Sequence, residues 1–155
     1  MYLGMKLLHV AAVIIFLGNI ITGLFWHRHA ARTRDPRILA HTMDGIIRSD
    51  RWFTIPGVVL IIIFGVAAAV LAGLPLLRTG WILWSLILFT LSGVAFMWKV
   101  APLQRQLRDL ALAGMNSGFD YDAYHRLAGR WEFWGGIALA TPLTALVLMV
   151  MKPVL

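Results

Sequence analysis

Residues 52–77 read WFTIPGVVLIIIFGVAAAVLAGLPLL, a run that contains no Asp, Glu, Lys or Arg. An α-helix needs about 20 predominantly apolar residues to cross the hydrocarbon core of a bilayer, and this run is longer than that. We therefore expect a membrane-spanning helix here, and we place it over about residues 52–74, before Pro75 and Gly80 mark a tight turn.

Three further uncharged runs occur at residues 10–26, 79–98 and 133–151. The first follows His9, and we extend its helix backwards to about residue 5. No cleavage site made of small residues comes after it, so we interpret this run as a retained helix and not as a signal peptide. The predicted spans are residues 5–26, 52–74, 79–100 and 133–151.

The composition agrees with a membrane protein. Apolar residues make up 60% of the chain and charged residues 14%, whereas soluble globular proteins average about 45–50% apolar residues. At 155 residues the chain has the length of one domain. The absence of cysteine excludes disulfides, thiolate metal sites and covalent c-type haem. We predict an all-α, four-helix transmembrane bundle.

Basic residues are distributed very unequally between the two faces of this bundle. Of the 14 Lys and Arg residues, 11 follow spans one and three or precede spans two and four, and the other three are Lys6, Arg78 and Lys152. Basic loops favour the cytoplasmic side. We therefore expect a multi-pass protein of the bacterial inner membrane with both termini on the periplasmic or extracellular side. Because the basic residues lie beside apolar spans, the net charge of +7 does not indicate nucleic-acid binding.

The first of the two longer loops carries an amphipathic pattern. Asp35 and Pro36 resemble an N-cap and a first helical residue, and apolar residues then recur at helical spacing over residues 38–47. This pattern predicts a cytoplasmic amphipathic helix that lies on the membrane surface and contacts anionic lipids. The second loop is expected to prolong span three beyond Pro102, and Asp120 or Asp122 is expected to cap a short segment before span four.

Aromatic and proline residues add expectations about the ends of the spans. All seven tryptophans, Trp131 included, fall near a predicted membrane interface, where the indole ring is favoured. Pro56 is expected in the first turn of span two, where proline is tolerated, and Pro142 is expected to kink span four.

His9 is the strongest candidate for chemistry, because it lies inside the outer part of span one. On a helical wheel Phe16 and Ile20 fall on the same side as His9, with Asn19 further round. An ionisable residue inside a span is a functional candidate by default. His9 is therefore a candidate axial ligand of haem iron, or alternatively an imidazole that holds two helices together by a hydrogen bond. Asn19 is expected to make an interhelical hydrogen bond.

Other polar residues offer weaker candidates. His27 and His125 are expected near the cytoplasmic border, where they either share a haem or metal site or face solvent. Met149 is one of several outer-face residues able to complete a site with His9. Asp50 and Glu132 are expected to form an N-cap and interfacial pairs with Arg51 and Arg130, or else a polar vestibule for a charged ligand.

Several stretches resemble the bacterial membrane family called domain of unknown function 2269. They are KLLHV in span one, TRDP in the first loop, SDRWFTIPGVVL at the start of span two, VAPLQRQL after span three, GRWEFWG at the start of span four and the closing VLMVMKP. This resemblance covers nearly the whole chain. It implies the four-helix topology and no particular activity.

The two ends of the chain also resemble HemJ-type protoporphyrinogen oxidases and CopD-type copper-resistance membrane proteins. The matching stretches are MKLLHVAAVIIFLG and LVLMVMKP. In the HemJ type the span-one histidine is implicated in haem b binding, which implies this role for His9. That family also relies on a lysine at the start of span three. This chain has Trp81 and Trp84 there, with Arg78 as the nearest basic residue, which argues against protoporphyrinogen oxidation itself.

Three functions follow from these observations. The first is a haem b-binding redox protein of the membrane, with His9 as an axial ligand and Phe16, Asn19 and Arg78 near the cofactor. The second is a copper-handling protein that uses His9 and the outer-face methionines, because thioethers suit cuprous ion. The third is a non-catalytic accessory or scaffold protein that acts as a homo-oligomer or with a membrane partner.

Overall fold

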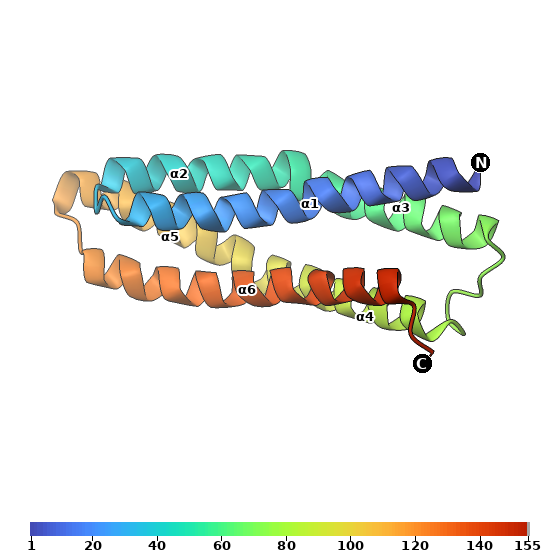
Figure 1. The fold of residues 1–155 in the computed structure, drawn as a ribbon. Helices are drawn as coiled ribbons and strands as arrows, with labels where there is room; N and C mark the ends of the chain where they lie inside the picture. The colour runs from blue at the N-terminus through green and yellow to red at the C-terminus, as the bar shows by residue number, and fades with distance from the viewer. Residues whose placement is uncertain (155) are drawn as a thin grey trace.

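Four helical rods run side by side, and short connections join each rod to the next (Figure 1). The computed structural model describes residues 1–154, and it describes Ser117 by its backbone alone. In this part of the chain there is no strand, and the helical elements are α1 (Tyr2–Ala31), α2 (Pro36–Ser49), η1 (Asp50–Thr54), α3 (Ile55–Leu71), α4 (Gly80–Ala95), η2 (Phe96–Val100), α5 (Ala101–Ser117) and α6 (Tyr121–Met151).

The two π-helical turns η1 and η2 each join two α-helices into one long rod. In η1 the N–H of Ile55 donates to the carbonyl of Asp50, and in η2 the N–H of Ala101 donates to that of Phe96. A proline follows each turn, at Pro56 and Pro102. Its ring crowds the carbonyl four residues earlier, and a wider turn relieves this crowding. Pro56 lies in the first turn of α3, as expected, although α2 continues through η1 into this helix.

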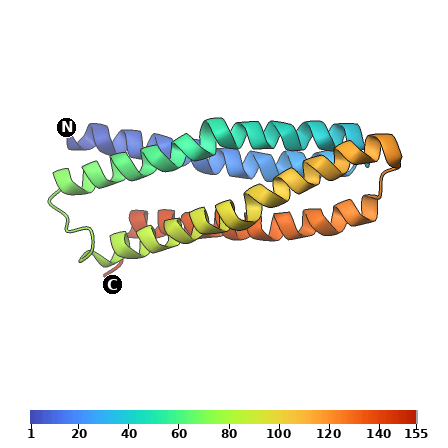
Figure 2. The same ribbon diagram turned by 180° about the vertical axis from the view of Figure 1, so that it is seen from behind.

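The single helices of these rods pack in pairs. In the pairs, α1 lies along α3, α4 lies along α6, and α2 lies along α5 (Figure 2). Both termini and the connection at residues 72–79 lie at one end of the bundle, which we name the terminal end. The connections at residues 32–35 and 118–120 lie at the other end, which we name the basic end. Asp35 and Asp120 cap the helices that begin there by accepting hydrogen bonds from the N–H groups of Arg37 and Ala123, as expected.

The outer surface of the rods is strongly apolar. Four helices of the described residues are long and apolar enough to cross a membrane, and only 17–22% of the most apolar 18-residue stretch of each is buried. Exposed apolar area of this extent indicates a lipid environment. The predicted four-helix transmembrane bundle is therefore confirmed, and the protein is a multi-pass integral membrane protein.

Part of the bundle must project beyond the membrane. The rods Pro36–Leu71 and Gly80–Asn116 contain 36 and 37 residues, so each is about 55 Å long, whereas the hydrocarbon core is about 30 Å thick. The charged residues of α2 and α5 indicate that the half nearer the basic end is the half that projects.

The amphipathic helix predicted for residues 38–47 exists as α2, but it does not lie on a membrane surface. Its apolar residues Leu39 and Met43 are fully buried in one cluster with Leu107 of α5. The prediction failed because an amphipathic pattern shows that a helix has an apolar side without showing whether lipid or another helix covers it.

The larger core cluster lies in the basic half and includes residues from α1, α2, α5 and α6. A second, smaller cluster lies nearer the terminal end, around Phe16 and Ile61, where the Phe16 and Phe89 ring centroids are 5.6 Å apart. The two clusters divide the interior of the protein into two regions.

Candidate functional site

His9 lies half-buried on α1, against α3, in the terminal half. Its Nδ1 is 2.9 Å from the carbonyl oxygen of Ile61. A carbonyl oxygen only accepts hydrogen bonds, so Nδ1 holds the proton and donates, and Nε2 keeps a lone pair. Metal-ligating histidines usually donate their second ring nitrogen to a backbone carbonyl or a carboxylate in this way. His9 thus links two helices in the tautomer that a ligand requires.

Gly65 makes room for the imidazole ring of His9. A Cβ atom at residue 65 would lie 2.9 Å from both Cε1 and Nδ1 of His9, closer than real side chains approach. The ring therefore packs directly on the backbone of α3, one helical turn beyond the carbonyl that accepts its hydrogen bond. Replacing Gly65 by any other residue would displace the ring.

The other residues predicted to surround a cofactor lie at several heights in the bundle. Phe16 is 3% exposed and packs between α1, α3 and α4. Arg78 is exposed in the connection at the terminal end, and Met149 is half-buried on α6. Within residues 1–154, Ile61 is the one hydrogen-bonding partner of the His9 side chain. The ligands that would complete a site at His9 stay predictions.

A second polar site surrounds Asp50 in the middle of the bundle. Its carboxyl oxygens accept hydrogen bonds from Asn19 Nδ2 at 3.0 Å, Thr54 Oγ1 at 2.7 Å and Gln104 Nε2 at 2.8 Å. Asp50 is 7% exposed. The interhelical hydrogen bond predicted for Asn19 is confirmed, whereas the N-cap predicted at Asp50 is wrong because the helix runs through this residue. The site holds α1, η1 and α5 in register.

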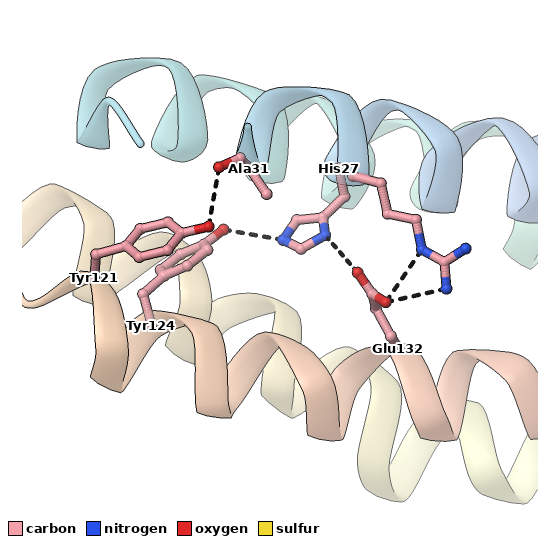
Figure 3. Close-up of polar contacts among 6 residues, drawn as sticks. His27, Ala31, Tyr121, Tyr124 and Glu132 are labelled. Carbon is pink, nitrogen blue, oxygen red and sulfur yellow. Dashed lines mark hydrogen bonds and ion pairs between the residues drawn. The ribbon is translucent and has the colours of Figure 1, made fainter. Parts of the chain in front are cut away.

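A third polar site lies between α1 and α6 near the basic end (Figure 3). His27 is 0% exposed, with Nε2 3.1 Å from the hydroxyl of Tyr124 and Nδ1 3.4 Å from Oε1 of Glu132. Since a carboxylate only accepts, the proton faces Glu132, and Nε2 accepts from the Tyr124 hydroxyl. Glu132 also accepts from Nε of Arg28 at 3.1 Å. The interfacial pairs expected between Glu132 and Arg51 or Arg130 are therefore wrong.

The structure brings His27 and His125 to one cavity, also lined by Tyr121 and Glu132. Among residues 1–154 there is no group of three or more His, Cys, Asp or Glu side chains able to hold a metal ion. A shared haem or metal site at these two histidines stays a prediction without a ligand set.

Trp131 corrects the expectation that every tryptophan lies at a membrane interface. It is 2% exposed, and its ring centroid lies 4.8 Å from that of His27. Its Nε1 has no hydrogen-bond partner among the described residues. Trp131, Asn19, Asp50 and Gln104 line a small cavity of about 20 Å³, which has room for about one water molecule.

Sequence reasoning did not find the contacts of Gln104 or Tyr124. Gln104 shares the buried side of α5 with Leu103 and Leu107, so a polar residue in an apolar stripe was a usable signal. Tyr124 had no such signal, because its partner His27 is 97 residues away. The contact between Tyr124 and His27 depends on the register of α1 against α6.

Comparison with known protein families gives a match over nearly the whole chain. The family model described as a predicted integral membrane protein, DUF2269, matches residues 3–153. No curated protein and no solved structure matches the chain. The family match covers nearly the whole chain and all four rods.

Proposed function

The chain belongs to the DUF2269 family of predicted integral membrane proteins, and we propose that it binds haem b through His9 and works as a redox protein of the membrane. The observation that carries this proposal is the hydrogen bond from His9 Nδ1 to the Ile61 carbonyl, because it leaves the Nε2 lone pair for iron. Haem b, when bound, would supply one-electron chemistry at its iron.

The residues around His9 would each have a defined task. The Ile61 carbonyl would hold the imidazole in one orientation, and Gly65 would give it space. The apolar cluster of Ala12, Phe16, Leu17 and Ile61 would exclude water from the site. Facing helices in a bundle are rigid supports for cofactor ligands. His9 is the one iron ligand that these residues would supply, which fits a haem with a single axial histidine from α1.

The experiment is an absorption spectrum of the protein purified from cells with an ample haem supply. We expect a Soret band in the wild type, its loss in His9→Ala, and its retention in His29→Ala, a matched change of an exposed histidine on the same helix. No Soret band in the wild type, or an unchanged band in His9→Ala, would overturn the proposal. Stoichiometric copper in a haem-free sample would favour the copper-handling alternative.

Gly65→Ala tests the same proposal without removing the ligand. The new methyl group would push the imidazole away from Ile61, so we expect haem affinity to fall about 10-fold or more. Gly93→Ala is the matched control, because a Cβ at residue 93 meets open space. Equal haem affinity in the two variants would contradict the role of the Ile61 hydrogen bond.

We also propose that the basic end faces the cytoplasm, with both termini on the periplasmic side of a bacterial inner membrane. The support is the excess of Lys and Arg at this end, and the same basic residues would attract anionic lipids. Since the chain has no cysteine, single cysteines can report the topology. In intact spheroplasts, an impermeant maleimide should label Leu77→Cys, and Arg37→Cys only after permeabilisation. The reverse pattern would overturn the orientation.

A further inference from the structure

The cavity beside His27 has the dimensions of a ligand site. Its volume is about 230 Å³, and an apolar cavity of about 150 Å³ in another protein holds benzene. Three small residues, Ala31, Ala128 and Gly129, create this space between α1 and α6. The space is therefore large enough for one ring and a substituent.

The floor of the cavity is buried and its rim is exposed. His27 and Tyr124 are 0% and 1% exposed, whereas Arg28, Arg32 and His125 at the rim are exposed. Charged residues at a rim keep it in contact with water instead of lipid. A ligand can thus reach the cavity from the aqueous side.

The charges around the cavity favour an anion. Arg28 is neutralised by Glu132, with its Nη2 3.1 Å from the carboxylate. The Arg32 side chain makes no ion pair or hydrogen bond within residues 1–154. One guanidinium charge is therefore free, and guanidinium groups bind carboxylates through paired N–H donors.

An underused donor lies beneath the floor of the cavity, at His27, which is 0% exposed. The His27 Nδ1 proton faces Glu132 at 3.4 Å, which is too long for a good hydrogen bond, and this atom has no other partner in the described residues. The remaining wall consists of alanine side chains, glycine and the rings of Tyr121 and Tyr124. Such a wall suits an apolar or aromatic body more than a highly charged one.

We propose that this cavity binds a small organic carboxylate whose apolar body is about the size of a benzene ring. The carboxylate lies at the free guanidinium of Arg32, and the body lies against Ala128, Gly129 and the tyrosine rings. This site is separate from His9 and does not depend on haem binding.

The probes are benzoate, its neutral analogue benzyl alcohol and inorganic phosphate, each titrated by calorimetry into the full chain in phosphatidylcholine nanodiscs. We expect saturable binding of benzoate and at least about 10-fold weaker binding of the other two, because each lacks either the charge or the ring. Phosphate binding without benzoate binding overturns the proposal, as does equal binding of benzoate and benzyl alcohol or no binding of any probe.

Two pairs of variants place the binding in this cavity. Gly129→Leu fills space that is open at this residue, and Gly136→Leu is its control, because it is two helical turns further along α6 and also meets open space. Arg32→Gln removes the free charge, and Arg37→Gln is its control on the neighbouring helix. We expect at least about 10-fold weaker benzoate binding in the first member of each pair and no change in the second. Unchanged binding in Gly129→Leu and Arg32→Gln overturns the site.

Discussion

The terminal half of the bundle holds His9 among apolar side chains, whereas the basic half buries two separate polar sites, one at Asp50 and one at His27 and Tyr124. The terminal half meets lipid, so its helices present apolar residues on every side and need few polar contacts. The basic half projects beyond the lipid and has a core of its own. Its buried polar groups fix the register of the helices. The helices of the terminal half are thus joined mainly by apolar packing and the His9 hydrogen bond, whereas those of the basic half are also joined by buried polar contacts.

The largest effect on stability is expected at Asp50. In Asp50→Ala, the donors of Asn19, Thr54 and Gln104 lose their acceptor inside the protein, which should lower the free energy of unfolding by about 3 kcal/mol or more. Asp44→Ala on the same rod removes only a surface pair with Arg48, which is worth about 0.5 kcal/mol or less. Unfolding titrations in detergent measure both, and equal losses would contradict a structural role for the Asp50 site.

A loss of stability of similar size, caused by lost apolar packing alone, is expected at Leu107. This side chain is 0% exposed in the core of the basic half, so Leu107→Ala should cost about 2–5 kcal/mol. Leu91 lies on the same rod in the terminal half and is 52% exposed. Because lipid surrounds it, Leu91→Ala should change stability by about 0.5 kcal/mol or less. The same unfolding titrations measure both variants. A larger loss of stability for Leu91→Ala than for Leu107→Ala would mean that the main core lies in the terminal half.

A smaller effect is expected at Tyr124. Tyr124→Phe removes the donor to His27 Nε2 and leaves a buried acceptor unpaired, which should cost about 1–3 kcal/mol. Tyr121→Phe removes a half-buried hydrogen bond to the Ala31 carbonyl and should cost about 1 kcal/mol. If Tyr121→Phe destabilised the protein more, the register contact between α1 and α6 would not lie at His27.

Much of the fold could be predicted from the sequence because lipid imposes a simple rule. Uncharged runs of sufficient length become spans, and aspartate before a helix becomes a cap, as at Asp35 and Asp120. The burial of α2 could not be predicted, because its apolar side at Leu39 and Met43 fits lipid as well as α5. The sequence pattern carries no information on which partner covers it.

The residues of the candidate sites also differ in whether they could be predicted from the sequence. His9 and Asn19 were predicted from their positions inside a span, where a polar residue is conspicuous. His27, Glu132 and Trp131 lie close to charged residues along the chain, so local patterns did not show that these side chains pack between α1 and α6. Their packing depends on contacts between residues about 100 positions apart, such as His27 with Glu132.

The central claim is that His9, and no histidine of the basic half, binds haem iron. The most direct test is the resonance Raman spectrum of the ferrous protein. We predict an iron–histidine stretching band that shifts on ¹⁵N-labelling of histidine, disappears in His9→Ala and persists in His27→Ala. A band that persists in His9→Ala, or that is lost in His27→Ala while the protein remains folded, would contradict the account.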